Sequence, residues 1–98
     1  MNNRSPLVSI ILPCRNEKDH IANCLGSILR QEAPPGGFEV IVADGMSDDG
    51  TQEILQHLAS KELHLRIVDN PARIVPTGLN AALKLANGEI IMRMDAHS

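Results

Sequence analysis

The chain has 98 residues, a formal net charge of −3 at pH 7 and a hydrophobic share of 43%. This length allows one domain with a hydrophobic core, and the composition excludes an intrinsically disordered chain. The negative charge and the single aromatic residue, Phe38, exclude the basic surface and the base-stacking platform of a nucleic-acid-binding protein.

The first predicted element is an apolar strand over residues 7–13, LVSIILP. Short runs of this kind, rich in β-branched residues and without alternation, are typical of buried parallel strands. We expect Asn16 to cap a helix over about residues 17–31, which a turn at residues 33–37 follows. The buried stripe of that helix has helical spacing and consists of Ile21, Cys24, Leu25, Ile28 and Leu29.

The second strand is predicted over residues 38–44, FEVIVAD, and leads into an acidic turn. Asp49 and Gln52 resemble a capping box at the start of a helix over about residues 50–60. Residues 63–69, LHLRIVD, predict a third strand. The buried stripe of the helix between these strands consists of Ile54, Leu55 and Leu58.

The last predicted helix follows a loop at residues 70–76, and we expect Thr77 to cap it. Asn87–Gly88 is predicted to end this helix in a left-handed conformation, before a fourth strand over residues 89–95. The order β-α-β-α-β-α-β with short links predicts an α/β fold with a parallel sheet and right-handed crossovers. The inward-facing residues of the last helix are predicted to be Leu79, Ala82, Leu83 and Ala86.

Acidic residues follow the strands at the ends that a parallel sheet brings to one edge. Asp44, Asp69 and Asp95 end the second, third and fourth predicted strands, and Glu17 lies just after the first. Ligands of open parallel sheets bind outside this edge. An acid after a strand often only forms a turn or caps a helix, which is our interpretation of Asp49. Asp44 and Asp95 have no helix start beside them, so we interpret them as ligand-binding residues.

A nucleotide fits the hydrogen-bonding character of this edge. Carboxylates accept hydrogen bonds from a base imide or ribose hydroxyls, and a divalent metal can bridge Asp95 to a diphosphate. Helix N-termini at the same edge supply N–H donors for phosphate. Neither the G-x-G-x-x-G fingerprint nor the P-loop pattern occurs in the chain. His20, His57 and His64 are predicted to be solvated, whereas one residue separates His97 from Asp95.

Three motifs resemble, in the same order, those of inverting family-two glycosyltransferases with fold A. VSIILPCRNE resembles the opening strand and its Asn-Glu turn, and VADGMSDDGT resembles the acidic second turn, usually written D-D-G-S-x-D-x-T. NPARIVPTGLNAALKLANGEIIMRMDAHS resembles the segment leading into the D-x-D motif, and its ending is most similar to succinoglycan-biosynthesis enzymes, which are bacterial exopolysaccharide glycosyltransferases. The resemblance covers nearly the whole chain. It implies part of a three-layer, Rossmann-like nucleotide-diphospho-sugar transferase fold.

The resemblance also implies site residues, position by position. Arg73 would approach the base or the diphosphate, Asp44 matches the uracil-contacting acid, and Asn16 would hold the first turn. Asp95 and His97 occupy the two acidic positions of D-x-D and would bind the metal. The full set of implied nucleotide-binding residues is Pro13, Arg15, Asn16, Glu17, Asp44, Ser47, Arg73 and Asp95.

Three positions depart from the family's pattern. Gly45 and Met46 replace the usual Asp-Gly, Leu79 precedes Asn80 where Arg is common, and His97 replaces the second Asp of D-x-D. Because imidazole suits Mn²⁺ better than Mg²⁺, we expect Mn²⁺ as the cofactor.

An inverting transfer needs a general base at the acceptor hydroxyl, and in this family that base lies well after D-x-D. We therefore expect no catalytic residue within the chain and a base beyond Ser98, so that residues 1–98 form the donor-binding half of a hexosyltransferase domain and are inactive alone. The expected partners are a UDP-sugar and, through the other half, a saccharide or lipid-linked acceptor of polysaccharide or cell-envelope synthesis. The fourth strand is predicted to be an exposed edge that supports self-association.

Cys14 and Cys24 match no metal-binding or redox spacing and are predicted to be reduced thiols. We expect a cytoplasmic protein, placed at the cytoplasmic face of the membrane if later segments include membrane helices. Two other functional classes stay open: a receiver-like regulatory α/β module with Asp44 as phosphoacceptor, and a plain interaction domain.

Overall fold

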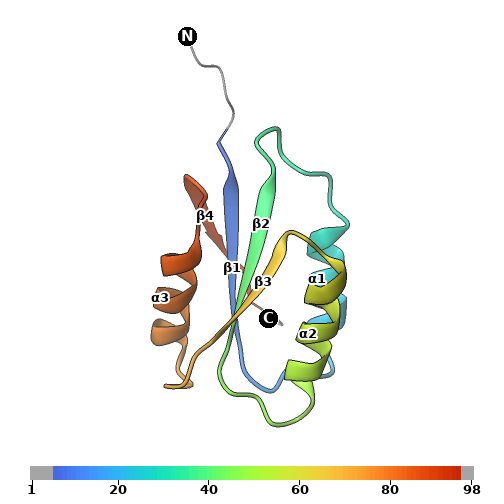
Figure 1. The fold of residues 1–98 in the computed structure, drawn as a ribbon, viewed down its shortest axis with the longest axis vertical. Coiled ribbons are helices and arrows are strands. Elements are labelled where there is room, and N and C mark those ends of the chain that lie inside the picture. The colour runs from blue at the N-terminus through green and yellow to red at the C-terminus, as the bar shows by residue number, and fades with distance from the viewer. Residues whose placement is uncertain (1–5, 96–98) are drawn as a thin grey trace.

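Four parallel strands form one sheet in the order β3-β2-β1-β4 in the computed structural model, which describes residues 6–95 (Figure 1). The predicted α/β class, the alternation of strand and helix and the parallel pairing are confirmed. The elements are β1 (Val8–Cys14), α1 (Ile21–Leu29), β2 (Phe38–Asp44), α2 (Thr51–Lys61), β3 (Leu65–Asp69), α3 (Val75–Leu85) and β4 (Ile90–Arg93).

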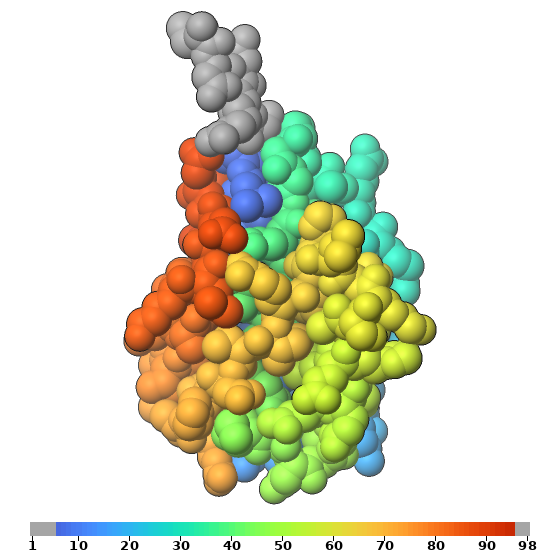
Figure 2. Space-filling view, in the orientation of Figure 1, coloured from blue at the N-terminus to red at the C-terminus, as the bar shows by residue number. Residues whose placement is uncertain are grey.

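Helices cover both faces of the sheet and give the fold three layers (Figure 1). The larger core lies between the sheet and helices α1 and α2, where Leu12, Leu25 and Leu55 are fully buried. The smaller core lies under α3, where Ala82 joins a cluster that includes Ile41. Figure 2 shows α3, in orange, along one side and α2, in yellow-green, along the other. Because alternate residues of a strand point to opposite faces, the continuous apolar runs of β1 and β2 supply both cores.

Helix α1 begins later than predicted. It starts at Ile21 with His20 at the N-cap position, and not at residue 17. Asn16 does not cap it, because the Asn16 side chain accepts a hydrogen bond from the N–H of Asp48 in the loop after β2. The polar residue that resembled a helix cap therefore joins two loops.

Helix α3 begins earlier than predicted. It starts at Val75 with Ile74 at the N-cap position, so Thr77 lies within the first turn. The Thr77 hydroxyl donates to Asn70 Oδ1 and to the Ile74 carbonyl. Pro76 at the start of the helix is favourable there, since its missing N–H would have no partner in the helix.

The end of α3 also differs from the prediction. The C-cap residue Ala86 is extended, with ψ 131°, and neither Asn87 nor Gly88 takes the predicted left-handed conformation. Leu83, predicted to face inward, is 44% exposed. No helix within residues 6–95 has the length and apolar character needed to cross a membrane.

Strand β4 is an edge strand, and among the described residues it pairs only with β1. It is shorter than predicted, and its register places Ile90 beside Val8 and Arg93 beside Ile11. Ile90, Ile91 and Met92 are each more than two-fifths exposed. The predicted exposed edge is confirmed.

The position of the core predicts different effects for two leucines. Leu25 of α1 is fully buried, whereas Leu63, just before β3, is 96% exposed. We expect Leu25→Ala to lower the free energy of unfolding by about 2–5 kcal/mol, because it leaves a cavity. Leu63→Ala should change it by less than about 0.5 kcal/mol. Denaturant unfolding of the two variants measures the difference, and equal losses would contradict this assignment of the core.

Candidate functional site

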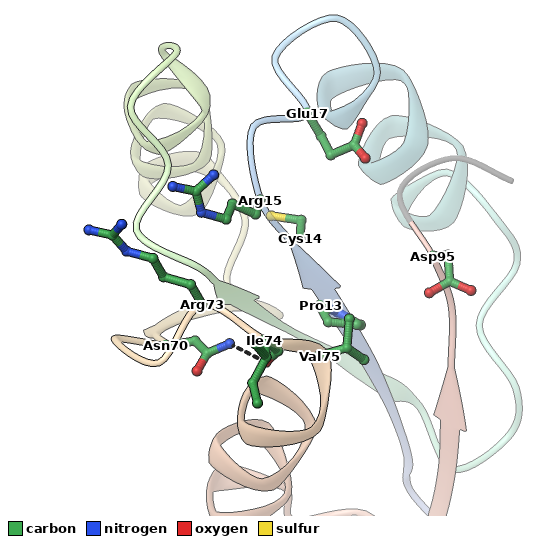
Figure 3. Close-up of a pocket in the computed structure, with 9 residues that line it drawn as sticks. All are labelled: Pro13, Cys14, Arg15, Glu17, Asn70, Arg73, Ile74, Val75 and Asp95. Atoms are coloured by element: carbon green, nitrogen blue, oxygen red, sulfur yellow. Dashed lines mark hydrogen bonds between the residues drawn. The ribbon is translucent and has the colours of Figure 1, made fainter.

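A pocket of about 320 Å³ opens at the carboxyl ends of the strands, between the loops that follow β1, β3 and β4 (Figure 3). This is the edge at which open parallel sheets bind ligands. Its wall combines two arginines, two acids, one amide and apolar side chains. The lining residues are Pro13, Cys14, Arg15, Glu17, Asn70, Arg73, Ile74, Val75 and Asp95.

The loops after β1 and β2 are joined by hydrogen bonds. The N–H of Asn16 donates to Ser47 Oγ at 2.8 Å, and Asn16 Oδ1 accepts the N–H of Asp48 at 2.9 Å. One residue further, the N–H of Glu17 donates to Thr51 Oγ1 at 3.0 Å. Asn16 has φ 53°, a left-handed conformation that Asn adopts more readily than most residues. Asn16 and Ser47 therefore shape the loop from outside the pocket.

Asp44, the last residue of β2, is fully buried. Its Oδ1 accepts from Ser47 Oγ at 2.6 Å and from Cys14 Sγ at 3.7 Å. Its Oδ2 accepts from the N–H of Ser47 at 3.1 Å and from Gln52 Nε2 at 2.8 Å. Gln52 therefore does not reach back toward Asp49, and the predicted capping box is wrong. The Asp44 carboxylate lies behind the pocket wall and holds the second turn in place.

The N-cap position of α2 is Gly50 and not the predicted Asp49, which instead hydrogen-bonds to the start of the helix from one residue earlier. Asp49 accepts hydrogen bonds from the hydroxyl and the N–H of Thr51, the first residue of the helix, and from the N–H of Lys18. The Thr51 hydroxyl contributes most to lowering the pKa of Asp49. Gly50 between them has φ 106°, which favours glycine. Much of the acidic turn is thus hydrogen-bonded to neighbouring backbone.

Cys14 lines the pocket as a buried free thiol. Burial, and next the negative charge of Asp44, raises the pKa of Cys14 to about 12. Its thiol is therefore protonated at neutral pH and is not a nucleophile. Cys24, on α1, is also free, and partial burial raises its pKa as well. Both cysteines are the unpaired thiols that the sequence predicted.

Asn70 is a site residue that sequence reasoning missed. It is 4% exposed, and its N–H donates to the carbonyl of Asp44 at 2.7 Å. Its Nδ2 donates to the Ile74 carbonyl at 2.8 Å, which shapes the loop that closes the pocket (Figure 3). Arg73 in this loop has φ 68° and donates its N–H to the Asn70 carbonyl. The only sequence signal was an Asn directly after a strand, which is equally typical of a plain turn.

Opposite charges occupy different sides of the pocket. In Figure 3 the guanidinium groups of Arg15 and Arg73 point to one side, away from the carboxylates of Glu17 and Asp95. The stem of Arg15 lies across Gly45, where an added Cβ would approach it to 3.2 Å. A side chain at this position would therefore require the Arg15 stem to shift. The departure from Asp to Gly in the second turn leaves room for this stem.

Asp95 is the described residue best placed to bind a metal. Its carboxylate lines the pocket and pairs with Arg93 at 3.2 Å, and both side chains are about half exposed. Within residues 6–95, no three His, Cys, Asp or Glu side chains come together as a metal-binding group. Asp95 can share a divalent cation with the oxygens of a bound diphosphate, which is the usual arrangement for Mg²⁺ and nucleotides. The predicted second ligand, His97, lies outside the described residues.

The pocket thus brings together much of the implied set, but not all of it. Three implied residues, Asn16, Asp44 and Ser47, lie outside the wall and hold its loops. Sequence reasoning did not assign Cys14, Asn70, Ile74 or Val75 to the site. The implied residues that line the pocket are Pro13, Arg15, Glu17, Arg73 and Asp95.

Comparison with known proteins assigns the family. Residues 9–98 match the family model described as Glycosyl transferase family 2. The chain belongs to glycosyltransferase family 2. It is 39% identical over 90 residues to the succinoglycan biosynthesis protein ExoA of Rhizobium meliloti, an alignment that covers 90% of this chain and 27% of that protein. Similarity to this type of enzyme was predicted and is confirmed.

Solved glycosyltransferase structures confirm the implied fold. Mannosyltransferase PcManGT from Pyrobaculum calidifontis, in complex with GDP-Man and Mn²⁺, has a TM-score of 0.86 and 35% identity over 96% of this chain. S. aureus TarS, in complex with UDP-GlcNAc, has a TM-score of 0.72 and 30% identity over 91% of this chain. The chain spans only 28% and 26% of those two structures.

The receiver-like alternative for this family 2 chain is wrong. Receiver domains have the strand order 2-1-3-4-5, in which the third strand lies beside the first. Here β3 lies beside β2. Asp44, the supposed phosphoacceptor, is fully buried with both oxygens hydrogen-bonded.

The two cysteines should react at different rates with iodoacetamide. At pH 8, a pKa of about 12 leaves about one Cys14 thiol in ten thousand as thiolate. We expect the single-thiol variant Cys24→Ser, which keeps Cys14, to be alkylated at least about tenfold more slowly than Cys14→Ser. Mass spectrometry follows the labelling, and unfolding in guanidinium should remove the difference. Equal rates in the folded protein would contradict the buried environment of Cys14.

Proposed function

We propose that this chain binds the nucleotide part of a nucleotide-sugar donor, as the donor-binding half of an inverting glycosyltransferase domain. The observation that carries the proposal is the pocket in which Arg15 and Arg73 lie opposite Glu17 and Asp95. Guanidinium groups donate hydrogen bonds to the oxygens of a base or a diphosphate, and carboxylates suit ribose hydroxyls or a bridging metal. Family membership and the donors named in the GDP-Man and UDP-GlcNAc complexes support it. The plain interaction domain does not account for this arrangement.

The proposed roles follow from position. Pro13, Arg15 and Glu17 form the part of the wall assigned to the base and ribose, and Arg73 extends from the opposite loop toward the base or diphosphate. Asp44 supports the pocket wall from its buried side. Direct contact with a nucleoside would require its hydrogen bonds to Ser47 or Gln52 to break. Asn16 and Ser47 maintain the loop.

A divalent metal is part of the proposal. Asp95 would hold it together with His97, and the donor's phosphate oxygens would complete its coordination. The bound metal would neutralise charge on the diphosphate leaving group. PcManGT in complex with Mn²⁺ supports a divalent ion, and the imidazole of His97 favours Mn²⁺ over Mg²⁺.

The rest of the reaction is assigned to sequence outside these 98 residues. We propose a UDP-sugar donor, a general base beyond Ser98 and a saccharide or lipid-linked acceptor, in polysaccharide or cell-envelope synthesis. The names of relatives that act on such acceptors, including poly(ribitol-phosphate) beta-glucosyltransferase, support this. A site at the cytoplasmic face of the membrane, where nucleotide sugars are available, fits the same role.

Calorimetric titration with UDP or GDP, with and without Mn²⁺, tests donor binding. We expect Arg73→Ala to weaken binding about tenfold or more in both conditions, because it removes a charged hydrogen-bond donor. Asp95→Asn should weaken binding only when Mn²⁺ is present. Arg30→Ala removes an exposed arginine that does not line the pocket and serves as the matched control. The proposal fails if neither diphosphate binds at millimolar concentration.

We also infer that β4 pairs with β4 of a second copy. The edge strand presents unpaired backbone groups and the exposed side chains of Ile90, Ile91 and Met92. In an antiparallel register centred on Ile91, Ile90 lies opposite Met92 of the second copy. The same register places Glu89 opposite Arg93 of the second copy, so opposite charges face each other at both ends. The two sheets would then form one sheet.

Sedimentation equilibrium over a range of concentrations tests this pairing. Ile91→Lys places two like charges at the centre of the interface, so we expect its dimer to weaken about tenfold or more. Leu63→Lys adds the same charge at an exposed position outside β4 and should not change association. A wild-type chain that stays monomeric, or a dimer that Ile91→Lys leaves intact, would rule the pairing out.

A further inference from the structure

A cluster of hydrogen bonds lies at the amino ends of the strands, the edge opposite the pocket. Ser9, Glu39 and Arg66 are the second residues of β1, β2 and β3, and Asn87 and Gly88 lie just before β4. We call these five residues the amino-edge cluster. They join all four strands, although no two of the strands are connected directly in sequence.

The contacts of the amino-edge cluster converge on one carboxylate. Glu39 Oε2 accepts from Ser9 Oγ at 2.6 Å and from the N–H of Asn87 at 2.7 Å. Glu39 Oε1 accepts from Arg66 Nη2 at 3.0 Å. Ser9 Oγ in turn accepts the N–H of Gly88 at 2.8 Å. Ser9 is fully buried and Glu39 is 9% exposed, so these bonds are shielded from water.

Gly88 fits this cluster because it has no side chain. A Cβ at Gly88 would lie 2.4 Å from Ser9 Oγ, 2.7 Å from Ser9 N and 2.8 Å from the Leu7 carbonyl. The next two N–H groups, of Glu89 and Ile90, donate to that same carbonyl of Leu7. The chain therefore enters β4 in close contact with β1 and at one fixed position along it.

The position of β4 along β1 decides where Asp95 lies. β4 has four residues and, within residues 6–95, pairs with one strand, so few contacts of its own fix the register. The N–H of Met94 still donates to Ile11, and Asp95 follows directly at the pocket wall. A slip of two residues keeps the same side chains on each face but moves Asp95 by about 6–7 Å. Asp95 would then leave the pocket.

We propose that Glu39 and Ser9 are positioning residues for the donor site, because they fix the register of β4 and thereby hold Asp95 at the pocket. The effect acts along the length of β4, from the amino edge of the sheet to its carboxyl edge. The part that concerns the donor rests on the proposed function of Asp95.

The chemistry of the cluster depends on the charge of Glu39. Burial acts to raise the pKa of Glu39, but the Ser9 hydroxyl, the Asn87 N–H and Arg66 together bring it below its ordinary value. The ionised form is therefore favoured in the folded state, and its contribution to stability is lost as the pH falls below about 4.5. In Glu39→Gln, an NH₂ group replaces one acceptor oxygen and faces N–H or O–H donors.

Amide hydrogen exchange of Glu39→Gln separates positioning from general stability. The N–H groups of Ile90 and Met94 report on the two ends of β4, and the N–H of Asn70, bonded to Asp44, reports on β2 and its neighbours. We expect exchange at Ile90 and Met94 to accelerate about tenfold or more, with Asn70 unchanged. The gain in UDP affinity from Mn²⁺ should fall, while affinity without metal should not change.

Two further variants complete the experiment. Ser9→Ala leaves Glu39 paired with Arg66 and removes the bond to Gly88, so it gives the same readouts if Glu39→Gln does not fold. Glu62→Gln makes the same charge change at an exposed position and should behave as wild type.

The possible outcomes are distinct. Equal acceleration at Ile90, Met94 and Asn70 would mean that the cluster only stabilises the fold and would overturn the proposal. Faster exchange in β4 with an unchanged effect of Mn²⁺ would overturn its link to the donor. If the wild-type chain binds no nucleoside diphosphate, the proposed function fails, and the exchange pattern still decides whether Glu39 and Ser9 fix β4.

Discussion

The buried carboxylate of Asp44 is the interaction on which the functional edge depends. It accepts hydrogen bonds from Ser47 and Gln52, and the carbonyl of the same residue accepts the N–H of Asn70. One residue therefore fixes the turn after β2, the first turn of α2 and the loop after β3. A buried charge with several N–H and O–H donors is well compensated, but losing it would leave those donors without a partner in the protein interior. The hydrogen bonds of Asp44 thus support the pocket wall from the protein interior.

Much of the fold could be predicted because its strands are buried on both faces. Sequences such as LVSIILP and FEVIVAD are too apolar for a half-exposed sheet, and the helical stripes between them leave one arrangement, a parallel sheet with helices on both faces. Strand ends were predicted to within about two residues. The residues that line the pocket and were predicted, such as Arg15 and Asp95, lie within two residues of strand ends that the sequence predicted to within about two residues.

The hydrogen-bond partners of polar side chains near helix starts could not be predicted, because such a side chain can bond either to the nearby helix or to a more distant residue. Asn16 and Thr77 are residue types that often cap helices, but the Asn16 side chain bonds to Asp48 in another loop, and Thr77 bonds to Asn70 at the start of the loop before its helix as well as to the nearby Ile74 carbonyl. Gln52 has the spacing of a capping box and instead reaches Asp44. Helix-cap patterns describe only partners within about four residues, whereas the bonds to Asn70, Asp44 and Asp48 join residues 7, 8 and 32 positions apart that the folded loops bring together. The same limit hid Asn70, whose role exists only once β2 and β3 are paired.

Strand β2 carries both acidic side chains that are buried within the described part of the chain, Glu39 near its start and Asp44 at its end. By the alternation of the strand they point to opposite faces, Glu39 with the α3 layer and Asp44 with the layer of α1 and α2. Each accepts one backbone N–H from a segment outside the strands: Glu39 from the turn before β4, and Asp44 from the loop after β2. A central apolar strand cannot bind such loops by itself, because hydrophobic contacts are not directional. The two carboxylates supply directional hydrogen bonds. Those of Asp44 hold the pocket wall, and those of Glu39 hold the strand that leads to Asp95.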